Sequence, residues 1–285
     1  TGNLEQGLFN VREDGDLITV FGGTLTTGWS AIFDRKTGGL VSMTQHADEK
    51  ASLKIQASSQ LNAFRAFTDN DKWTANAWFG NGLHTLADQA SEVTVDKSSN
   101  KYVRITAKVR SQGRTSDKVP EQNSGYHKLV KGPELGENGF HFDSVYTWTI
   151  FPGGIVSFDS VGSGAGPSIV IPRIGQELHL SPELDRFTWY GRGPGENYSD
   201  RKTGSDIGLY DSSVKDLFVR YPKPMDMANH EDVRWCALTN KEGHGLVIAA
   251  RSDRMSVSAL PWTGMELLAA RHPQRLPASQ KTVLN

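Results

Sequence analysis

The chain has 285 residues, and its 31 basic and 32 acidic side chains leave a formal net charge of -1. This balance gives no electrostatic reason to expect a nucleic acid or an anionic membrane as a partner. One cysteine, Cys236, excludes an internal disulfide and a zinc site built from cysteines. No stretch approaches the ~18 consecutive apolar residues that span a bilayer. We therefore predict neither a nucleic-acid nor a membrane partner.

The chain starts at Thr1 rather than Met, and no charged-then-apolar leader opens it. We therefore expect a processed product or a piece of a longer polypeptide. A single cysteine suits both a cytoplasmic and a periplasmic protein, so the location stays open.

Four turn sequences separate short apolar segments in chain order, at residues 13–16, 36–39, 151–154 and 240–243. Each contains glycine, which supplies the positive φ that tight hairpin turns need. Each is therefore predicted to join two antiparallel strands.

Apolar and polar residues alternate along the segments 102–109, 142–150 and 254–259. Strands with one apolar and one polar face are typical of antiparallel sheets that are covered on one side. We find no β-α-β rhythm and no dividing linker. The pattern therefore predicts an all-β fold, with residues 1–285 forming one large antiparallel β-sandwich domain.

Helical signals are few. Residues 212–219 predict a short helix that starts at a serine cap and stops before Pro222. The stretch 73–86 predicts a helical turn. The polar segment 111–139 lacks alternation and predicts a long loop, of the kind that is usually functional or mobile.

The first polar cluster, Arg65–Asp71, has the sequence Arg-Ala-Phe-Thr-Asp-Asn-Asp and precedes Lys72 and Trp73. In one interpretation, Asp-Asn-Asp is a turn that satisfies its own backbone while Arg65 pairs with one aspartate. In the other, the side chains form a polar rim that binds sugar hydroxyls or supports a catalytic pocket.

The second cluster, Gly191–Arg201, has the sequence Gly-Arg-Gly-Pro-Gly-Glu-Asn-Tyr-Ser-Asp-Arg. No Lys-Ser or Lys-Thr pair follows its glycines, so it is not a phosphate-binding loop. It either forms a structured loop, in which an acidic residue pairs with an arginine, or presents Arg, Asn and Tyr to a ligand.

The third cluster, Asn229–Trp235, places His230 beside Glu231 and Asp232. This group invites a metal or general-base role. However, neighbours on a strand point to opposite faces, so the three side chains cannot converge from one strand. We expect a loop-to-strand transition with Arg234 in a buried ion pair. The other histidines lack ligand spacing, and a lone histidine is more often a structural group than a ligand.

Hydrolysis of a glycoside needs two carboxylates about 5–5.5 Å apart for retention, or about 6.5–9.5 Å apart for inversion. Sequence alone does not fix the distances between the acidic candidates, which are Asp69, Asp71, Glu196, Asp200, Glu231 and Asp232.

In this order, the three clusters resemble the C-terminal, small-chain domain of the bacterial β-galactosidases of glycoside hydrolase family 2. The family patterns are Arg-Ala-Pro-x-Asp-Asn-Asp, Gly-x-Gly-Pro-x-Glu-Asn-Tyr-x-Asp-Arg and Asn-x-x-Asp-Val-Arg-Trp. The first matches except at Phe67, and the other two match at every specified position. The resemblance runs from about Asp14 to the last residue.

The resemblance implies a galactose-mutarotase-like supersandwich at the C-terminus of a larger enzyme. That parent would hydrolyse terminal non-reducing β-D-galactose residues with retention, using two glutamates on a separate (β/α)-barrel. This chain alone is therefore expected to be inactive and to hold no cofactor, since the Mg²⁺ and Na⁺ ions of the family sit mainly on the barrel. The implied partners are the barrel, the β-galactoside and further copies of the parent.

The resemblance also implies that this chain packs on the barrel and shapes the mouth of the sugar pocket. No catalytic residue is expected in it. The residues expected at the pocket rim are Arg65, Asp69, Asn70, Asp71, Trp73 and Trp78. The residues expected to build structural loops are Gly191, Gly193, Pro194, Glu196, Asn197, Tyr198, Asp200, Arg201, Asn229, Asp232, Arg234 and Trp235.

Four further residues depart from the family pattern. Trp73 stands where glycine is familiar, which favours a stiffer loop or a new stacking surface for a sugar. Asp226 and Met227 stand where the family has Glu-Asn, so one polar contact is expected to be lost. Val283 replaces an aromatic residue that touches substrate in well-known members. The chain stops before the Gly-rich segment that ends the family pattern, so we expect it to be truncated.

Two other functions stay open. A mutarotase-type sugar epimerase would share the fold and would need a histidine acid and a carboxylate base, for which His141 and Glu177 are the candidate pair. The Gly191–Arg201 motif argues against it, because mutarotases do not carry that motif. The second alternative is a carbohydrate-binding or purely structural module.

Overall fold

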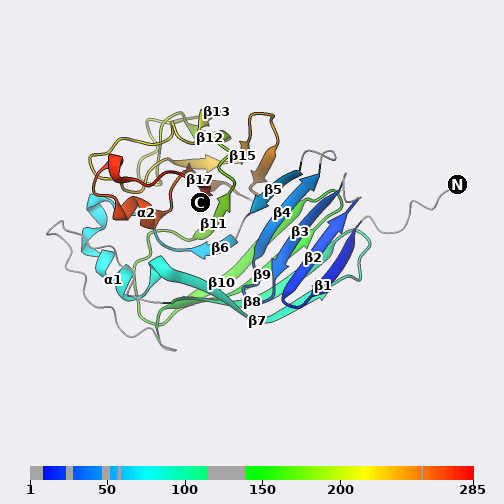
Figure 1. Ribbon diagram of the computed structural model, residues 1–285. Helices are drawn as coiled ribbons and strands as arrows, with labels where there is room; N and C mark the ends of the chain where they lie inside the picture. The colour runs from blue at the N-terminus through cyan, green and yellow to red at the C-terminus, as the bar shows by residue number, and fades with distance from the viewer. Residues whose placement is uncertain (1–8, 24–27, 47–51, 57–58, 115–138, 252) are drawn as a thin grey trace. The chain divides into compact units, whose positions relative to one another are not determined.

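The structure, a computed structural model, describes residues 9–23, 28–46, 52–56, 59–114, 139–251 and 253–285. Nearly all of its regular elements are antiparallel strands, which form four sheets (Figure 1). The predicted all-β class and its antiparallel sandwich architecture are confirmed.

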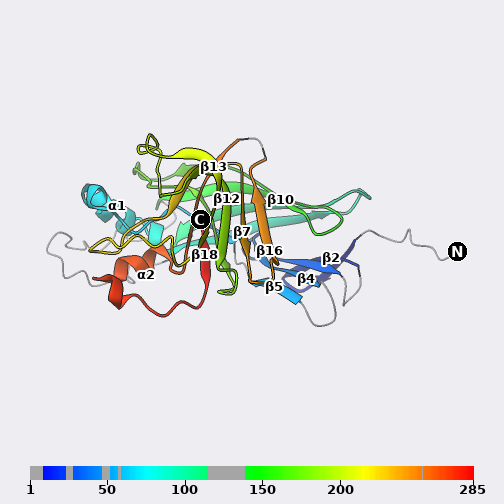
Figure 2. The ribbon, with the colours of Figure 1, turned by 90° about the horizontal axis from the view of Figure 1, so that it is seen from above.

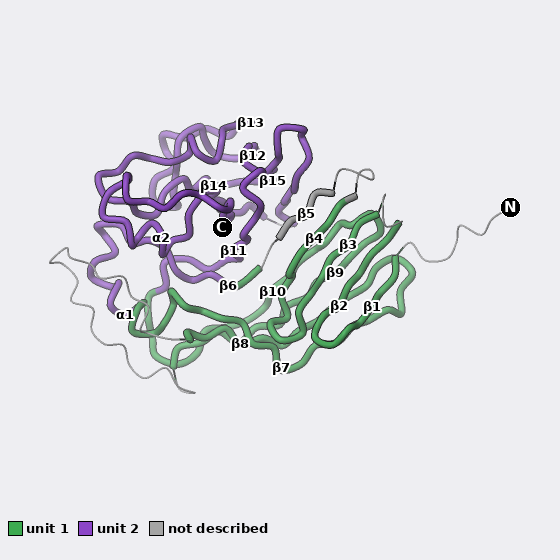
Figure 3. Tube along the Cα trace, viewed as in Figure 1, with its two compact units in different colours: residues 1–61, 78–117, 131–170 green, residues 62–77, 118–130, 171–285 purple. Residues whose placement is uncertain are grey.

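The described residues form two compact units (Figure 3). The first takes those within 1–61, 78–117 and 131–170, and the second takes those within 62–77 and 171–285. Each unit therefore draws on separate stretches of the chain.

Two sheets build the first unit. One has the order β1-β2-β3-β4-β5, with β1 (Asn10–Asp14), β2 (Leu17–Gly22), β3 (Trp29–Asp34), β4 (Leu40–His46) and β5 (Ser52–Gln56). The other has the order β10-β9-β8-β7, with β7 (Leu86–Asp96), β8 (Val103–Gly113), β9 (His141–Ile150) and β10 (Val156–Ala165). Both contribute to one core, whose buried residues include Ile18, Phe33, Ile105, Tyr146 and Trp148. The alternation along each strand thus turns one face of each sheet inward.

Three of the four predicted hairpins lie in this unit and are confirmed. Residues 13–16 join β1 to β2, residues 36–39 join β3 to β4, and residues 151–154 join β9 to β10. Gly38 has a φ of +71°, and a Cβ there would lie 2.7 Å from the Ala107 side chain. Glycine therefore serves both the turn and the close packing beneath it.

The second unit also has two sheets. One has the order β14-β17-β18-β11-β6, with β6 (Ser59–Asn62) at the boundary of the units, β11 (Gly175–Leu180), β14 (Asn229–Val233), β17 (Met255–Leu260) and β18 (Thr282–Leu284). The other has the order β13-β12-β15-β16, with β12 (Arg186–Gly193), β13 (Asp206–Ser213), β15 (Trp235–Thr239) and β16 (Gly245–Ala249). Figure 2 shows these strands from a second direction. The predicted hairpin at 240–243 joins β15 to β16.

The core of the second unit joins its two sheets through stacked rings. The Trp189 ring on β12 lies 4.1 Å, between centroids, from the His230 ring on β14. Phe187 stacks on Trp189 at 5.2 Å. All three side chains are at most 1% exposed, so this aromatic stack holds the strands that carry the second and third clusters.

Helical structure is sparse, as predicted, but one prediction was wrong and one helix was missed. The 73–86 stretch holds α1 (Ala75–Gly80) and the 3-10 turn η2 (Leu83–Thr85), preceded by η1 (Asp69–Trp73). Residues 212–219 do not form a helix, because Ser212 and Ser213 pair with β12 as the end of β13 and only a turn follows.

The missed helix is α2 (Gly264–Ala269), and η3 (Pro273–Arg275) follows it. Thr263 caps α2, and its hydroxyl accepts from the Glu266 backbone while the Glu266 carboxylate accepts from the Thr263 backbone. This is a capping box, which the Thr-x-x-Glu sequence indicates. In the described part of the chain, no helix is long and apolar enough to cross a membrane. Residues 115–138 of the predicted long loop lie outside the described residues.

Candidate functional site

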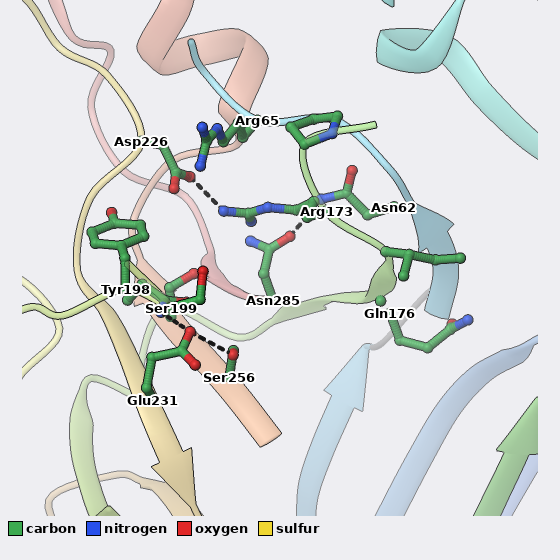
Figure 4. Close-up of a pocket in the computed structure, with 15 residues that line it drawn as sticks. Asn62, Arg65, Arg173, Gln176, Tyr198, Ser199, Asp226, Glu231, Ser256 and Asn285 are labelled. Atoms are coloured by element: carbon green, nitrogen blue, oxygen red, sulfur yellow. Dashed lines mark hydrogen bonds and ion pairs between the residues drawn. The ribbon is translucent and has the colours of Figure 1, made fainter. Parts of the chain in front are cut away.

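A polar cavity of about 300 Å³ lies within the second unit (Figure 4). Residues from all three clusters line it: Arg65 from the first, Tyr198 and Ser199 from the second, and Asn229 and Glu231 from the third. Segments more than 130 positions apart thus meet at one site, so the clusters share a place in the fold as well as an order in the sequence.

The first cluster is built around an ion pair between Arg65 and Asp71. The Arg65 Nε lies 3.0 Å from Asp71 Oδ2 and its Nη2 lies 2.7 Å from Oδ1, a two-pronged contact. The backbone N–H of Thr68 also donates to Asp71 Oδ2, at 2.9 Å. The predicted pairing of Arg65 with one aspartate, and the self-satisfied turn, are confirmed. Asp71 thereby fixes η1 while Arg65 faces the cavity.

The other proposed rim residues have very different exposures. Asp69 and Asn70 are exposed on η1, and Trp73 at its end is 77% exposed. Trp78 is 1% exposed and lies in the first unit, where its indole N–H donates to the Val170 carbonyl at 2.7 Å. Of the two tryptophans, Trp73 presents its ring to solvent.

Glu196 is the centre of the second cluster. Its carboxylate accepts hydrogen bonds from Arg201 Nη2 at 2.7 Å, from the Ala228 backbone N–H at 2.8 Å and from the Tyr221 hydroxyl. The predicted staple between an acidic residue and an arginine of this loop is confirmed as Glu196–Arg201. Asp200 is exposed. The loop is therefore held to the segment that precedes β14.

The glycines of the second cluster stand where side chains would collide. A Cβ on Gly191 would lie 2.7 Å from the Val233 side chain, and one on Gly193 would lie 2.6 Å from the Tyr210 ring. Pro194 follows through a cis peptide bond. The motif thus allows β12 to lie directly against its neighbours.

The third cluster contains a β-bulge that overturns one prediction. The pairing of β14 with β17 shifts between His230 and Val233, and Asp232 has a φ of +55°. This left-handed residue lets both Glu231 and Asp232 approach Lys202 Nζ, at 3.3 and 3.4 Å. The two carboxylates therefore converge, contrary to the strand geometry assumed from sequence, whereas His230 points into the aromatic stack.

Arg234 also departs from its prediction. Its Nη1 donates to the Asp232 carbonyl at 2.6 Å, and its guanidinium carbon lies 5.5 Å from the centre of the Tyr190 ring. In the described part of the chain, this cation contact and the carbonyl replace the expected buried ion pair. Trp235 begins β15 and pairs with Tyr190.

Most residues of the cavity wall were not singled out as site residues from the sequence, including Arg173, Gln176, Asp226 and Asn285. Asp226 Oδ1 accepts from Arg173 Nη2 at 2.6 Å, and the Asp226 backbone N–H donates to the Ala66 carbonyl. The side-chain amide of Asn285 bonds to that of Asn62 at 2.6 Å. From the sequence, Asp226 was marked only as a departure from the pattern that the chain resembles.

Burial governs the electrostatics of the cavity. It raises the pKa of the Tyr198 hydroxyl well above its ordinary value, and the Asp226 and Glu196 carboxylates reinforce that rise. Tyr198 is therefore a protonated hydroxyl at any ordinary pH. Among the described residues, no group of three or more His, Cys, Asp or Glu side chains could hold a metal ion.

The candidate mutarotase pair is divided between the two units. In the first unit, His141 Nδ1 contacts the Gly139 carbonyl at 2.8 Å. In the second, Glu177 contacts His179 Nε2 at 2.7 Å and Asn62 Nδ2 at 3.2 Å. Each side chain therefore has hydrogen-bond partners of its own in its own unit.

Comparison with known proteins identifies the family of this chain. Residues 26–285 match the family described as "Beta galactosidase small chain". The chain belongs to the β-galactosidase small chain family. The three clusters that meet at the cavity are thus parts of a small-chain sequence, and Val283, the position expected to carry a substrate-touching aromatic, is fully buried in β18.

Curated relatives place this small-chain sequence inside longer proteins. It is 29% identical over 274 residues to the beta-galactosidase of Priestia megaterium, covering 96% of this chain and 23% of that protein. It is 29% identical over 268 residues to the beta-galactosidase of an Arthrobacter species, covering 89% and 24%. For beta-galactosidase BgaC of Bifidobacterium adolescentis, the identity is 27% over 255 residues, covering 88% and 22%. The chain thus spans about a quarter of the length of these relatives.

Proposed function

We propose that this chain is the small-chain region of a larger polypeptide that hydrolyses terminal non-reducing β-D-galactose residues with retention of configuration. The observation that carries the proposal is the family match over residues 26–285, together with relatives named beta-galactosidase that are about four times longer. Residues 1–285 would act as one module, since each unit draws on separate stretches of chain.

Catalysis would belong to carboxylates outside this chain. A retaining hydrolase needs two free carboxylates about 5–5.5 Å apart, one on each side of the scissile bond. Each of the two carboxylates at the cavity is already held through one oxygen: Asp226 Oδ1 by Arg173, and Glu231 Oε1 by Ser256 at 2.6 Å and Asn229 at 2.9 Å. The chain would therefore pack on a catalytic barrel and help to shape its sugar pocket.

The test compares the 285-residue chain with the complete polypeptide on a chromogenic β-galactoside. We expect hydrolysis by the complete polypeptide, with retention seen by NMR of the first-formed sugar anomer. We expect no hydrolysis above buffer by the 285-residue chain. Enzyme-like turnover by that chain alone would place the catalytic pair within it and overturn this division of labour.

Trp73 would be this chain's contact with the substrate. It is 77% exposed at the end of η1, and η1 is anchored by the Arg65–Asp71 pair. An exposed ring on a fixed turn suits the apolar face of a sugar. In the complete polypeptide, Trp73→Ala is expected to raise KM for the β-galactoside about tenfold, while the neighbouring Lys72→Ala leaves KM within about twofold. An unchanged KM in the Trp73 variant would remove this residue from the pocket rim.

A further inference from the structure

The cavity of the second unit contains polar atoms without partners. In the described part of the chain, Tyr198 Oη, Asp226 Oδ2 and Gln176 Oε1 are buried and make no hydrogen bond. Asp226 is only 8% exposed. Buried polar groups are nearly always satisfied. Three exceptions on one cavity therefore indicate that it receives something that bonds to them.

The three atoms surround the cavity. Figure 4 shows Tyr198 and Asp226 on one side and Gln176 on the other. Ile174, which also lines the cavity, is 61% exposed and supplies an apolar surface. A ligand would thus meet hydrogen-bonding groups from two sides and an apolar contact at the edge, a combination typical of sites for small molecules.

The charges at the cavity compensate one another. Arg173 lies 2.6 Å from Asp226, and Arg65, which lines the cavity, pairs with Asp71, which does not line it. Glu231 is hydrogen-bonded by neighbours and lies 3.3 Å from Lys202. An anion would meet the Asp226 and Glu231 carboxylates, and a cation would meet the two arginines. The balance favours a neutral ligand.

Hydroxyl groups could form the hydrogen bonds that the three unpartnered atoms lack. Asp226 Oδ2 and Gln176 Oε1 need donors, whereas Tyr198 Oη can donate and accept, and an alcohol does both. Several hydroxyls on one molecule are needed because the unpartnered atoms lie on opposite sides. We propose that this cavity binds a neutral polyhydroxylated molecule of monosaccharide size through Asp226, Tyr198 and Gln176. Its volume of about 300 Å³ is at the lower end of small-molecule sites.

The inference goes beyond the proposed hydrolase function, because binding would need only residues of the second unit. The test is calorimetric titration of the 285-residue chain with D-glucose, D-galactose and D-mannose, and with D-galacturonate and D-glucosamine as charged counterparts. We expect at least one neutral hexose to bind at millimolar concentration or below, and both charged sugars to bind about tenfold more weakly or worse. No binding of the three neutral hexoses, or tighter binding of a charged one, would overturn the proposal.

Tyr198→Phe separates recognition from folding. Its hydroxyl has no partner in the described residues, so its removal is expected to leave the urea midpoint unchanged or higher while weakening the hexose about tenfold. Gln176→Leu is a second variant on the opposite side, with the same expected loss. Tyr190→Phe, on a side chain that is 40% exposed and does not line the cavity, should alter neither quantity. Wild-type affinity in both cavity variants would contradict the proposal.

Discussion

Asn197 and Asn229 hold each other's backbone in place. The backbone N–H of Asn197 donates to the Asn229 carbonyl at 2.7 Å, and the side chain of Asn229 donates to the Asn197 carbonyl at 2.8 Å. The Asn197 side chain accepts in turn from the Glu231 backbone at 2.8 Å. This exchange clamps the second cluster to the third and positions Tyr198 at the cavity.

Glu196, next to this clamp, should be the residue of the second cluster that is most sensitive to substitution. Glu196→Ala removes the acceptor for Arg201, Tyr221 and the Ala228 backbone N–H at once. Unsatisfied donors then remain in a partly buried place, so we expect a loss of about 2–4 kcal/mol in unfolding free energy, measured by urea denaturation. Asp200→Ala in the same loop is exposed and should change it by less than about 0.5 kcal/mol. Equal effects of the two substitutions would contradict the assignment.

Substitution of Gly191 tests how closely β12 packs against its neighbours, and substitution of Gly195, just after the strand, is the control. Gly191→Ala would bring a methyl group to 2.7 Å from the Val233 side chain, so we expect destabilisation of about 1–3 kcal/mol. Gly195→Ala has no atom within 4 Å of its new methyl group and should be neutral or slightly stabilising. Thermal unfolding of both variants checks the difference, and a neutral Gly191→Ala would show that the strands can separate without cost.

The Arg65–Asp71 pair should contribute far more to the free energy of unfolding than the charged pair beside it. Asp71→Asn leaves the half-buried Arg65 guanidinium without its counter-charge, and we expect a loss of about 3 kcal/mol. Asp69→Asn breaks only a surface contact with Lys72, which should cost less than about 1 kcal/mol. If the two variants unfold at the same urea concentration, the pair does not anchor η1.

His230 should make stability depend on pH. Burial lowers the pKa of His230 to about 4, against an ordinary value near 6.5. The unfolded chain therefore binds more protons between these values, so stability is complete above about pH 6.5 and falls as the pH drops toward 4, by about 3 kcal/mol at most. Burial also lowers the pKa of His84 to about 4, which adds to the slope with the same sign.

Substitution of His230 tests whether this residue causes the dependence of the unfolding free energy on pH. His230→Phe keeps an aromatic ring beside Trp189 but cannot take up a proton, so unfolding free energies measured from pH 4 to 7 should vary less steeply than in the parent chain. His244→Gln, at an exposed turn, should keep the parent slope. An unchanged slope in His230→Phe would mean that other groups govern the acid sensitivity.

Local chemistry explains which features could be predicted from sequence. The hairpin glycines and the ion pair of Arg65 act over a few positions, and the sequence predicted the turns and a pairing of Arg65 with one of the nearby aspartates. The helix at 212–219 was wrong because Ser212 and Ser213 gain strand partners in β12, a tertiary contact that outweighs the local cap. Arg173 and Asp226 lie 53 positions apart, and no local pattern links them. The bulge at Asp232 likewise depends on its partner strand.

The division of the fold into two units has a genetic consequence. Each unit is made of segments that are separated in the sequence by a segment of the other unit. Residues 62–77 of the second unit, for example, lie between two segments of the first. No single gene break could release either unit as an uninterrupted product. Recombination and domain shuffling would therefore be expected to transmit the two together, so any ligand-binding property of one is inherited with the scaffold of the other.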